Sequence, residues 1–275
     1  MHPENQKLHL LFIKIELQNN IQNNLKSLAS LVLSDFNEKS PFINKSLFSC
    51  ISQLPFKSNV YATLVALINL DNPEIAFNLI AFLHQNIISA IHAGNWNILK
   101  IMIRFYAQLV YSRTASIDSL FAIYMQLLDH DGLKIQEADC LVYILVASLP
   151  FVGSFIHATR PDLLHSLMLN IAQHMQKRES IYNQKLESGH VNSSTINALK
   201  IYKVTDDSIL GYNQHDQLSD LYIQILNLES SNWQFNLLER TSDLFTSQLE
   251  SQTIVHYVNI AQSPTITKNI KLSKL

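Results

Sequence analysis

The chain has 275 residues, 47% of them hydrophobic and 15% charged, and its 20 Lys and Arg against 22 Asp and Glu give a net charge of −2. This balance excludes a strongly basic nucleic-acid-binding face, because non-specific binding neutralises roughly 6–10 phosphates with clustered Lys and Arg. Five glycines and seven prolines are too few for the many tight turns of an all-β fold, so composition predicts an all-α protein.

Helical patterns begin close to the amino terminus. Residues 8–17 are mostly apolar, and residues 20–33 repeat apolar side chains on one face, so both stretches are predicted to be helical. The tripeptide Ser40-Pro41-Phe42 predicts the start of another helix that runs toward Gln53, with proline at the tolerated first position.

The segment from Leu54 to Asn69 predicts a sharp corner between two helices. Pro55 ends the first helix, because its ring clashes with the preceding turn and it has no N–H to donate. Ser58 or Asn59 is predicted to cap the next helix. Apolar residues then recur at helical spacing, so one face of this helix must be covered.

The middle of the chain carries clear helix-start signals. Asn72-Pro73-Glu74 predicts a helix that ends at Ala93-Gly94. Asn95 is predicted to cap a helix from Trp96 to about residue 112, and Ser116 to cap residues 117–128. Residues 129–132 then form a predicted turn.

Residues 134–149 are apolar on nearly all sides, which predicts a central helix. A second corner, residues 148–153 (Ser-Leu-Pro-Phe-Val-Gly), repeats the Leu-Pro signal of the first. Arg160-Pro161-Asp162 predicts a helix to about residue 183, a loop or insert follows at about 185–214, and helical patterns resume at 216–228 and 233–249.

These helices come in pairs about 35–45 residues apart, the period of helical-repeat solenoids. One pair cannot cover its own apolar face, so the pairs must stack. We therefore predict an all-α, HEAT-like helical-repeat stack of antiparallel helix pairs, with residues 1–258 as a single domain and 259–275 as a flexible tail. Such stacks usually bind other molecules rather than transform them.

Compartment signals are few. Cys50 and Cys140 both lie in apolar helical runs, which favours buried free thiols over a disulfide and fits a reducing compartment. No signal peptide is expected at the amino terminus. The most apolar stretch, residues 140–153, is short and broken by Pro150, and no membrane partner is predicted.

Several elements together resemble a known family. The first corner contributes Leu54, Pro55, Lys57, Tyr61, Thr63, Leu64, Val65, Leu67 and Asn69. Other matching positions are Asn24, Leu25, Leu28, Ala29, Arg104, Phe105, Leu109, Val110, residues 148–153, Lys177, Arg178 and Trp233. In this order, over roughly residues 20–251, they resemble the amino-terminal helical domain of the large subunit of the nuclear cap-binding complex, a domain of the type first described in the middle of translation initiation factor 4G.

The resemblance implies a scaffold rather than an enzyme. In that family a small RNA-recognition subunit stacks the methylguanosine cap between its aromatics, and the large subunit braces it mainly through two later helical domains. The chain resembles about one third of that scaffold, so no cap-contacting residue is expected in it. The implied partners are the small subunit, capped RNA indirectly, and factors of RNA processing, splicing, export and nonsense-mediated decay.

No residue is predicted to be catalytic, to bind a cofactor or to ligate a metal. His157, His165 and His174 lack metal-ligand spacing on one helix, and the Asp129-x-Asp131-Gly132 turn lacks the remaining ligands of a calcium loop. Arg104 is expected to pair between helices or to cap a carbonyl. Trp96 and Trp233 are expected to pack rather than to stack on bases, because no basic groove accompanies them.

Alternatives remain open at this point. A cytoplasmic translation-initiation-type scaffold and a generic helical-repeat adaptor fit the same helical pattern. The resemblance implies a nuclear location with possible shuttling to the cytoplasm, whereas Ser273-Lys274-Leu275 matches a peroxisomal address if it is the true carboxyl end.

Overall fold

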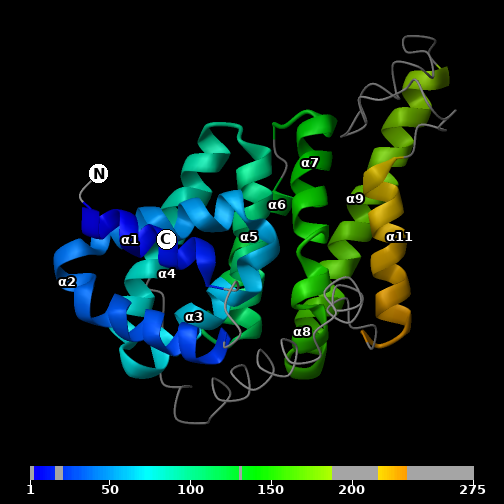
Figure 1. The fold of residues 1–275 in the computed structure, drawn as a ribbon. Coiled ribbons are helices and arrows are strands. Elements are labelled where there is room, and N and C mark those ends of the chain that lie inside the picture. The colour runs from blue at the N-terminus through cyan, green and yellow to red at the C-terminus, as the bar shows by residue number, and fades with distance from the viewer. Residues whose placement is uncertain (1–2, 16–20, 130–131, 188–215, 234–275) are drawn as a thin grey trace, which may run out of the picture. The chain divides into compact units, whose positions relative to one another are not determined.

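The computed structural model describes residues 3–15, 21–129, 132–187 and 216–233, and every regular element among them is helical (Figure 1). The α-helices are α1 (Pro3–Lys14), α2 (Ile21–Gln53), α3 (Ser58–Asp71), α4 (Pro73–His92), α5 (Trp96–Tyr111), α6 (Ile117–Leu128), α7 (Ile135–Val146), α8 (Gly153–Thr159), α9 (Pro161–Glu187) and α11 (Gln217–Ser230), with 3-10 helices η1 (Pro55–Lys57) and η2 (Leu149–Phe151). The all-α prediction is confirmed for these residues. They divide into two compact units, residues 3–120 and 121–233.

In the first unit each helix packs against the next, from α1 through α5, and α3 also contacts α5. The sequence predicted one apolar face for α3, yet α3 is buried on every side, from Val60 through Asn69. Phe48 of α2 joins the neighbouring helices, because its ring lies 5.2 Å from that of Phe82 and 6.1 Å from that of Phe105.

The predicted helix break inside residues 21–53 is confirmed. The backbone of Lys39 leaves the helical region (φ −121°, ψ 16°), so α2 is two helical segments joined at a kink. Pro41 lies two residues later, at the start of the second segment. Its missing N–H costs no hydrogen bond there, because the first turn of a helix has no intrahelical acceptors for its amides.

The predicted caps are confirmed at three helices and only in part at α3, where Asn59 Oδ1 accepts a hydrogen bond from the Val60 amide (2.9 Å). Asn72 accepts hydrogen bonds from two first-turn amides of α4 at 3.1 and 3.2 Å, Asn95 accepts one in α5 at 3.3 Å, and Ser116 accepts one in α6 at 3.0 Å. At α3 the N-cap position is Lys57, without a side-chain cap. The Ser58 hydroxyl instead donates back to the Pro55 carbonyl (2.8 Å), because η1 continues almost directly into α3.

The first corner also holds the end of α1. The Lys57 ammonium donates to the carbonyl of Ile13 (3.0 Å), and the Tyr61 hydroxyl donates to the carbonyl of Phe12 (3.1 Å). Carbonyls in the last turn of a helix have no intrahelical partner. A cation at this end also interacts favourably with the helix dipole. Lys57 and Tyr61, four residues apart, therefore form a tertiary cap on α1.

Both cysteines are free thiols, as predicted, although only one is buried. Cys50 is buried in α2, whereas Cys140 of α7 is half-buried. Burial raises the pKa of the Cys50 thiol to about 11, so almost none of it is thiolate at neutral pH.

We expect Cys50 to resist modification until the first unit unfolds, because the thiolate is the nucleophile and it is scarce at this site. In a Cys140→Ser variant, a maleimide reagent should label Cys50 slowly in buffer and rapidly in denaturant. The Cys50→Ala variant is the control, and its Cys140 should react faster under native conditions. Equal labelling rates for the two folded variants would contradict the expected protection.

Helices α4 and α5 share an aromatic contact between a half-buried histidine and a buried tyrosine. The imidazole of His84 stacks on the ring of Tyr106 with 5.1 Å between the ring centroids and 19° between the planes. Burial lowers the pKa of His84 below 6.5 and raises the pKa of Tyr106 to about 12, so both side chains are neutral near pH 7.

This neutral histidine predicts an acid-sensitive first unit. Because the pKa of His84 is lower in the folded state than its unfolded value of 6.5, its contribution is fully present above pH 6.5 and is lost as pH falls below it. Denaturant titrations from pH 8 to pH 5 should therefore show a steeper loss of unfolding free energy for the wild type than for His84→Gln. Parallel curves for the two proteins would show that His84 does not cause the loss.

By length and hydropathy, α4 is also long and apolar enough to cross a membrane, as is the bent pair 135–151 and 153–159 if it is counted as one span. One face of α4 is nevertheless covered by α3 and α5, with Leu79 and Leu83 buried. Core helices of packed stacks meet the same test, so the result is weak evidence for a span.

In the second unit the Ser-Leu-Pro corner is confirmed. Helix α7 ends at Val146, η2 contains Pro150, and α8 starts at Gly153. The Ser148 hydroxyl donates to the carbonyl of Leu145 (2.7 Å) and lies 2.6 Å from the Tyr124 hydroxyl, which is the donor in that second contact because the serine proton is already used. This corner is therefore joined to α6.

The later boundaries are settled only in part. Helix α9 runs through Glu187, so residues 185–187 are helical and not part of the predicted loop. Trp233 follows the end of α11 with a φ of 59°. The rest of the predicted insert to residue 214, the helix continuing to 249, the tail 259–275 and the carboxyl-terminal tripeptide lie outside the described residues. The single domain 1–258 stays a prediction.

Candidate functional site

Four ionisable side chains meet inside the second unit. Asp139 of α7 is 1% exposed and accepts a hydrogen bond on each carboxylate oxygen, from His174 Nε2 (2.9 Å) and from Arg178 Nε (2.7 Å). Arg178 also forms an ion pair with Asp216, the residue that caps α11. The cluster therefore joins α7, α9 and the first turn of α11.

In this cluster the oppositely charged partners, rather than burial, determine the direction of the pKa shifts. Burial alone would lower the pKa of Arg178, but hydrogen bonds to Asp216 and Asp139 outweigh burial and raise it. Burial alone would likewise raise the pKa of Asp216, but the Arg178 guanidinium outweighs it and lowers the pKa. Both groups stay charged at neutral pH, and the network serves to hold three helices together.

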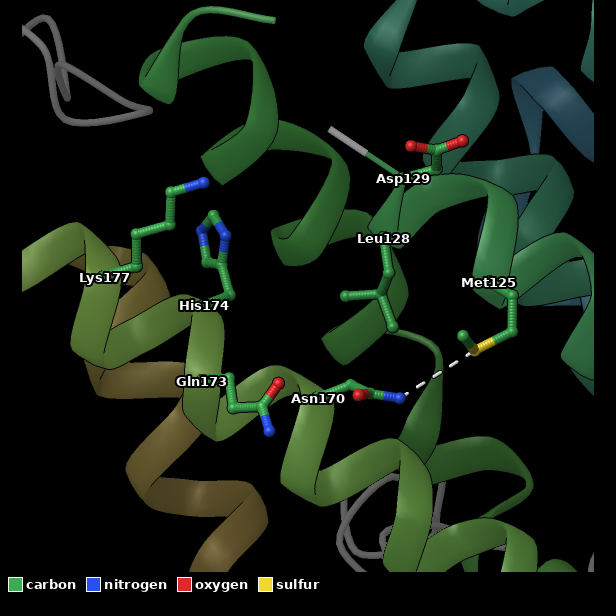
Figure 2. Close-up of a pocket in the computed structure, with 7 residues that line it drawn as sticks. All are labelled: Met125, Leu128, Asp129, Asn170, Gln173, His174 and Lys177. Atoms are coloured by element: carbon green, nitrogen blue, oxygen red, sulfur yellow. Dashed lines mark hydrogen bonds between the residues drawn. The ribbon is translucent and has the colours of Figure 1, made fainter. Parts of the chain in front are cut away.

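Beside the network lies an open pocket of about 320 Å³ (Figure 2). Its lining residues come from the end of α6 and the middle of α9, and they are Met125, Leu128, Asp129, Asn170, Gln173, His174 and Lys177. His174 belongs to both features, because its ring lines the pocket while its Nε2 is bound to Asp139.

Gly153 packs directly against the side chain of Trp233. A Cβ atom built on Gly153 would overlap the six-membered ring of Trp233, so only glycine leaves room for the indole. Trp233 is 5% exposed, which confirms that it packs in the core.

We expect Gly153→Ala to lower the free energy of unfolding by about 1–3 kcal/mol, because an added methyl in a filled site forces its neighbours to shift. The exposed Ser154→Ala in the same helix is a matched control and should change stability little. Denaturant titration of both variants measures the difference. A Gly153→Ala variant as stable as the control would contradict the packing.

The other singled-out residues are dispersed. Trp96 begins α5 and Arg104 lies half-buried within it, while His157 is half-buried in α8 and His165 is exposed on α9. Within the described part of the chain, no group of three or more His, Cys, Asp or Glu is arranged to hold a metal ion.

Sequence reasoning missed the buried network. Lys177 and Arg178 stood out only through the family resemblance, and neither Asp139 nor Asp216 was predicted to have a buried partner. The available signal was the position of Asp139 next to the apolar residues of the helix 135–146, since Asp is seldom fully buried without a partner.

Packed helices with sharp proline corners, joined by buried polar side chains, define a helical-repeat protein. The chain belongs to the MIF4G domain family, whose sequence profile matches residues 6–199. This match confirms the predicted helical-repeat fold class and the family resemblance.

Two relatives carry the same name, "Nuclear cap-binding protein subunit 1". The protein of Arabidopsis thaliana is 28% identical over 213 residues, which cover 74% of this chain and 24% of the relative. The protein of Anopheles gambiae is 23% identical over 264 residues, which cover 94% of this chain and 30% of the relative. The chain thus spans between about a quarter and a third of the length of these relatives.

Proposed function

We propose that the chain acts as a non-enzymatic scaffold in a nuclear cap-binding complex, as one part of its large subunit. The observation that carries this proposal is the similarity of 94% of the chain to one relative named for that complex. The buried charged groups support a scaffold, because Lys57 and Arg178 are both used to hold helix ends. The proposed location is the nucleus.

The scaffold would support cap recognition indirectly. In this proposal the small RNA-recognition subunit contacts the 7-methylguanosine cap, and the chain holds that assembly together with factors of transcript processing, export and surveillance. The composition favours indirect RNA contact, because the full chain carries a net charge of −2.

Recovery of the tagged full chain from its own cells tests the proposal. We expect the small cap-binding subunit to co-purify and the assembly to be retained on 7-methylguanosine resin and released by free cap analogue. Translation-initiation factors without the small subunit would instead support a cytoplasmic initiation-type scaffold. Absence of the chain from the cap-eluted fraction would overturn the proposed function.

A further inference from the structure

The pocket between α6 and α9 has two unlike walls (Figure 2). Met125 and Leu128 of α6, three residues apart, form an apolar wall. The opposite wall is one face of α9, where residues 170, 173, 174 and 177 follow the i, i+3, i+4, i+7 spacing and all carry hydrogen-bonding groups. A ligand that fits both walls must itself be apolar on one side and polar on the other.

The polar wall suits a peptide backbone. The carboxamides of Asn170 and Gln173 each offer a donor and an acceptor, which match the alternating C=O and N–H groups of an extended peptide. The Asn170 amide lies 4.0 Å from the Met125 sulfur, a weak contact that a peptide carbonyl can replace. His174 is held in place by Asp139, so this wall is rigid at its centre.

The charged side chains of the pocket determine which charge the ligand carries and which way round it binds. Lys177 is exposed, and no carboxylate in the described part of the chain pairs with it. The Asp129 carboxylate lies on the far side of the pocket from Lys177 (Figure 2). An acidic group is therefore favoured at the Lys177 end, whereas a phosphate backbone running across the whole pocket would meet Asp129.

We propose that this pocket docks an extended acidic peptide segment of a partner protein. One apolar side chain of the peptide packs on Met125 and Leu128, its backbone bonds to Asn170 and Gln173, and its carboxylate pairs with Lys177. A volume of about 320 Å³ is at the small end of ligand pockets, enough for one side chain and the backbone around it. Met125 is 49% exposed, and flexible methionines are common at peptide-binding surfaces. The inference goes beyond the proposed scaffold role, to which it adds a docking site.

Fluorescence anisotropy with the full chain tests this site. The probe is a fluorescein-labelled Gly-Ser-Leu-Asp-Asp-Ser-Gly peptide, compared with versions in which Leu becomes Ser or both Asp become Lys. We expect saturable binding of the first peptide only. Lys177→Glu and Met125→Glu should each weaken it by about tenfold or more, because each removes one of the two recognised features. Lys45→Glu, an equally exposed charge reversal on α2, should bind like the wild type.

Several outcomes would overturn the docking site. The first is no saturable binding of the peptide at millimolar concentration, and the second is equal binding of the peptide in which both Asp become Lys. The third is an unchanged peptide affinity in Lys177→Glu. The fourth is a Lys177→Glu variant that still binds the peptide but no longer binds a labelled single-stranded RNA probe. Circular dichroism of each variant establishes that it is folded, which is expected because residues 125 and 177 are exposed. Cap-resin recovery of Lys177→Glu separates the two proposals, since it stays normal if only peptide docking is lost.

Discussion

Replacing Arg178 with methionine should lower the free energy of unfolding of the second unit by about 3–5 kcal/mol, the usual cost of removing one partner from a buried ion pair. Arg178 is 7% exposed and is bound by both Asp139 and Asp216. Without the guanidinium, the 1% exposed Asp139 carboxylate loses the hydrogen bond from Arg178 Nε, and the first turn of α11 loses its tie to α9.

Denaturant titration measures the global loss, and amide hydrogen exchange locates it. Exchange should accelerate most in α11 (217–230), because Asp216 caps that helix and is held by Arg178. Lys177→Met is the matched control, since it removes an exposed cation from the neighbouring position and should change stability little. Adding Asp139→Asn and Asp216→Asn to Arg178→Met should recover part of the loss, because the two carboxylates that Arg178 had bound are then replaced by neutral amides. A loss equal to that of the control would show that the network does not hold α11.

Local signals predicted the corners of this fold well. Pro55 and Pro150 end helices because a proline restricts the chain wherever it occurs, and Asn72 and Asn95 cap helices through contacts only two or three residues long. Such features depend on neighbours in sequence, so they can be read before the fold is known.

The partners of the buried charges could not be predicted in the same way. Arg178 lies 39 residues from Asp139, and Lys57 lies 44 residues from the carbonyl that it binds. These pairs form only when particular helix faces pack together, and hydrophobic periodicity leaves the choice of faces open. The burial of α3 on every side was missed for the same reason, because Thr63 and Asn69 are polar and yet buried.

Replacing Lys57 with methionine should lower the free energy of unfolding of the first unit by about 1.5–3 kcal/mol, the range for a lost hydrogen bond with a charged donor. Methionine keeps the apolar stem but leaves the Ile13 carbonyl, now 3.0 Å from the ammonium, without this donor. The effect should be local, so amides of α1 should exchange faster while those of α3 stay protected. Lys45→Met, on the exposed face of α2, controls for loss of one positive charge.

A double-mutant cycle decides whether Lys57 and Tyr61 act as one cap. Tyr61→Phe removes only the hydroxyl that donates to Phe12, and alone it should cost about 1 kcal/mol. Both side chains bind the same end of α1, so once one substitution has detached that end, the second has little left to remove. The double variant should therefore lose less unfolding free energy than the sum of the two single losses. Additive losses would mean that α1 is held mainly by its apolar contacts with α2. Non-additive losses would mean that the Lys and Tyr of the first corner, two of the residues that make the chain resemble its family, are there to dock α1.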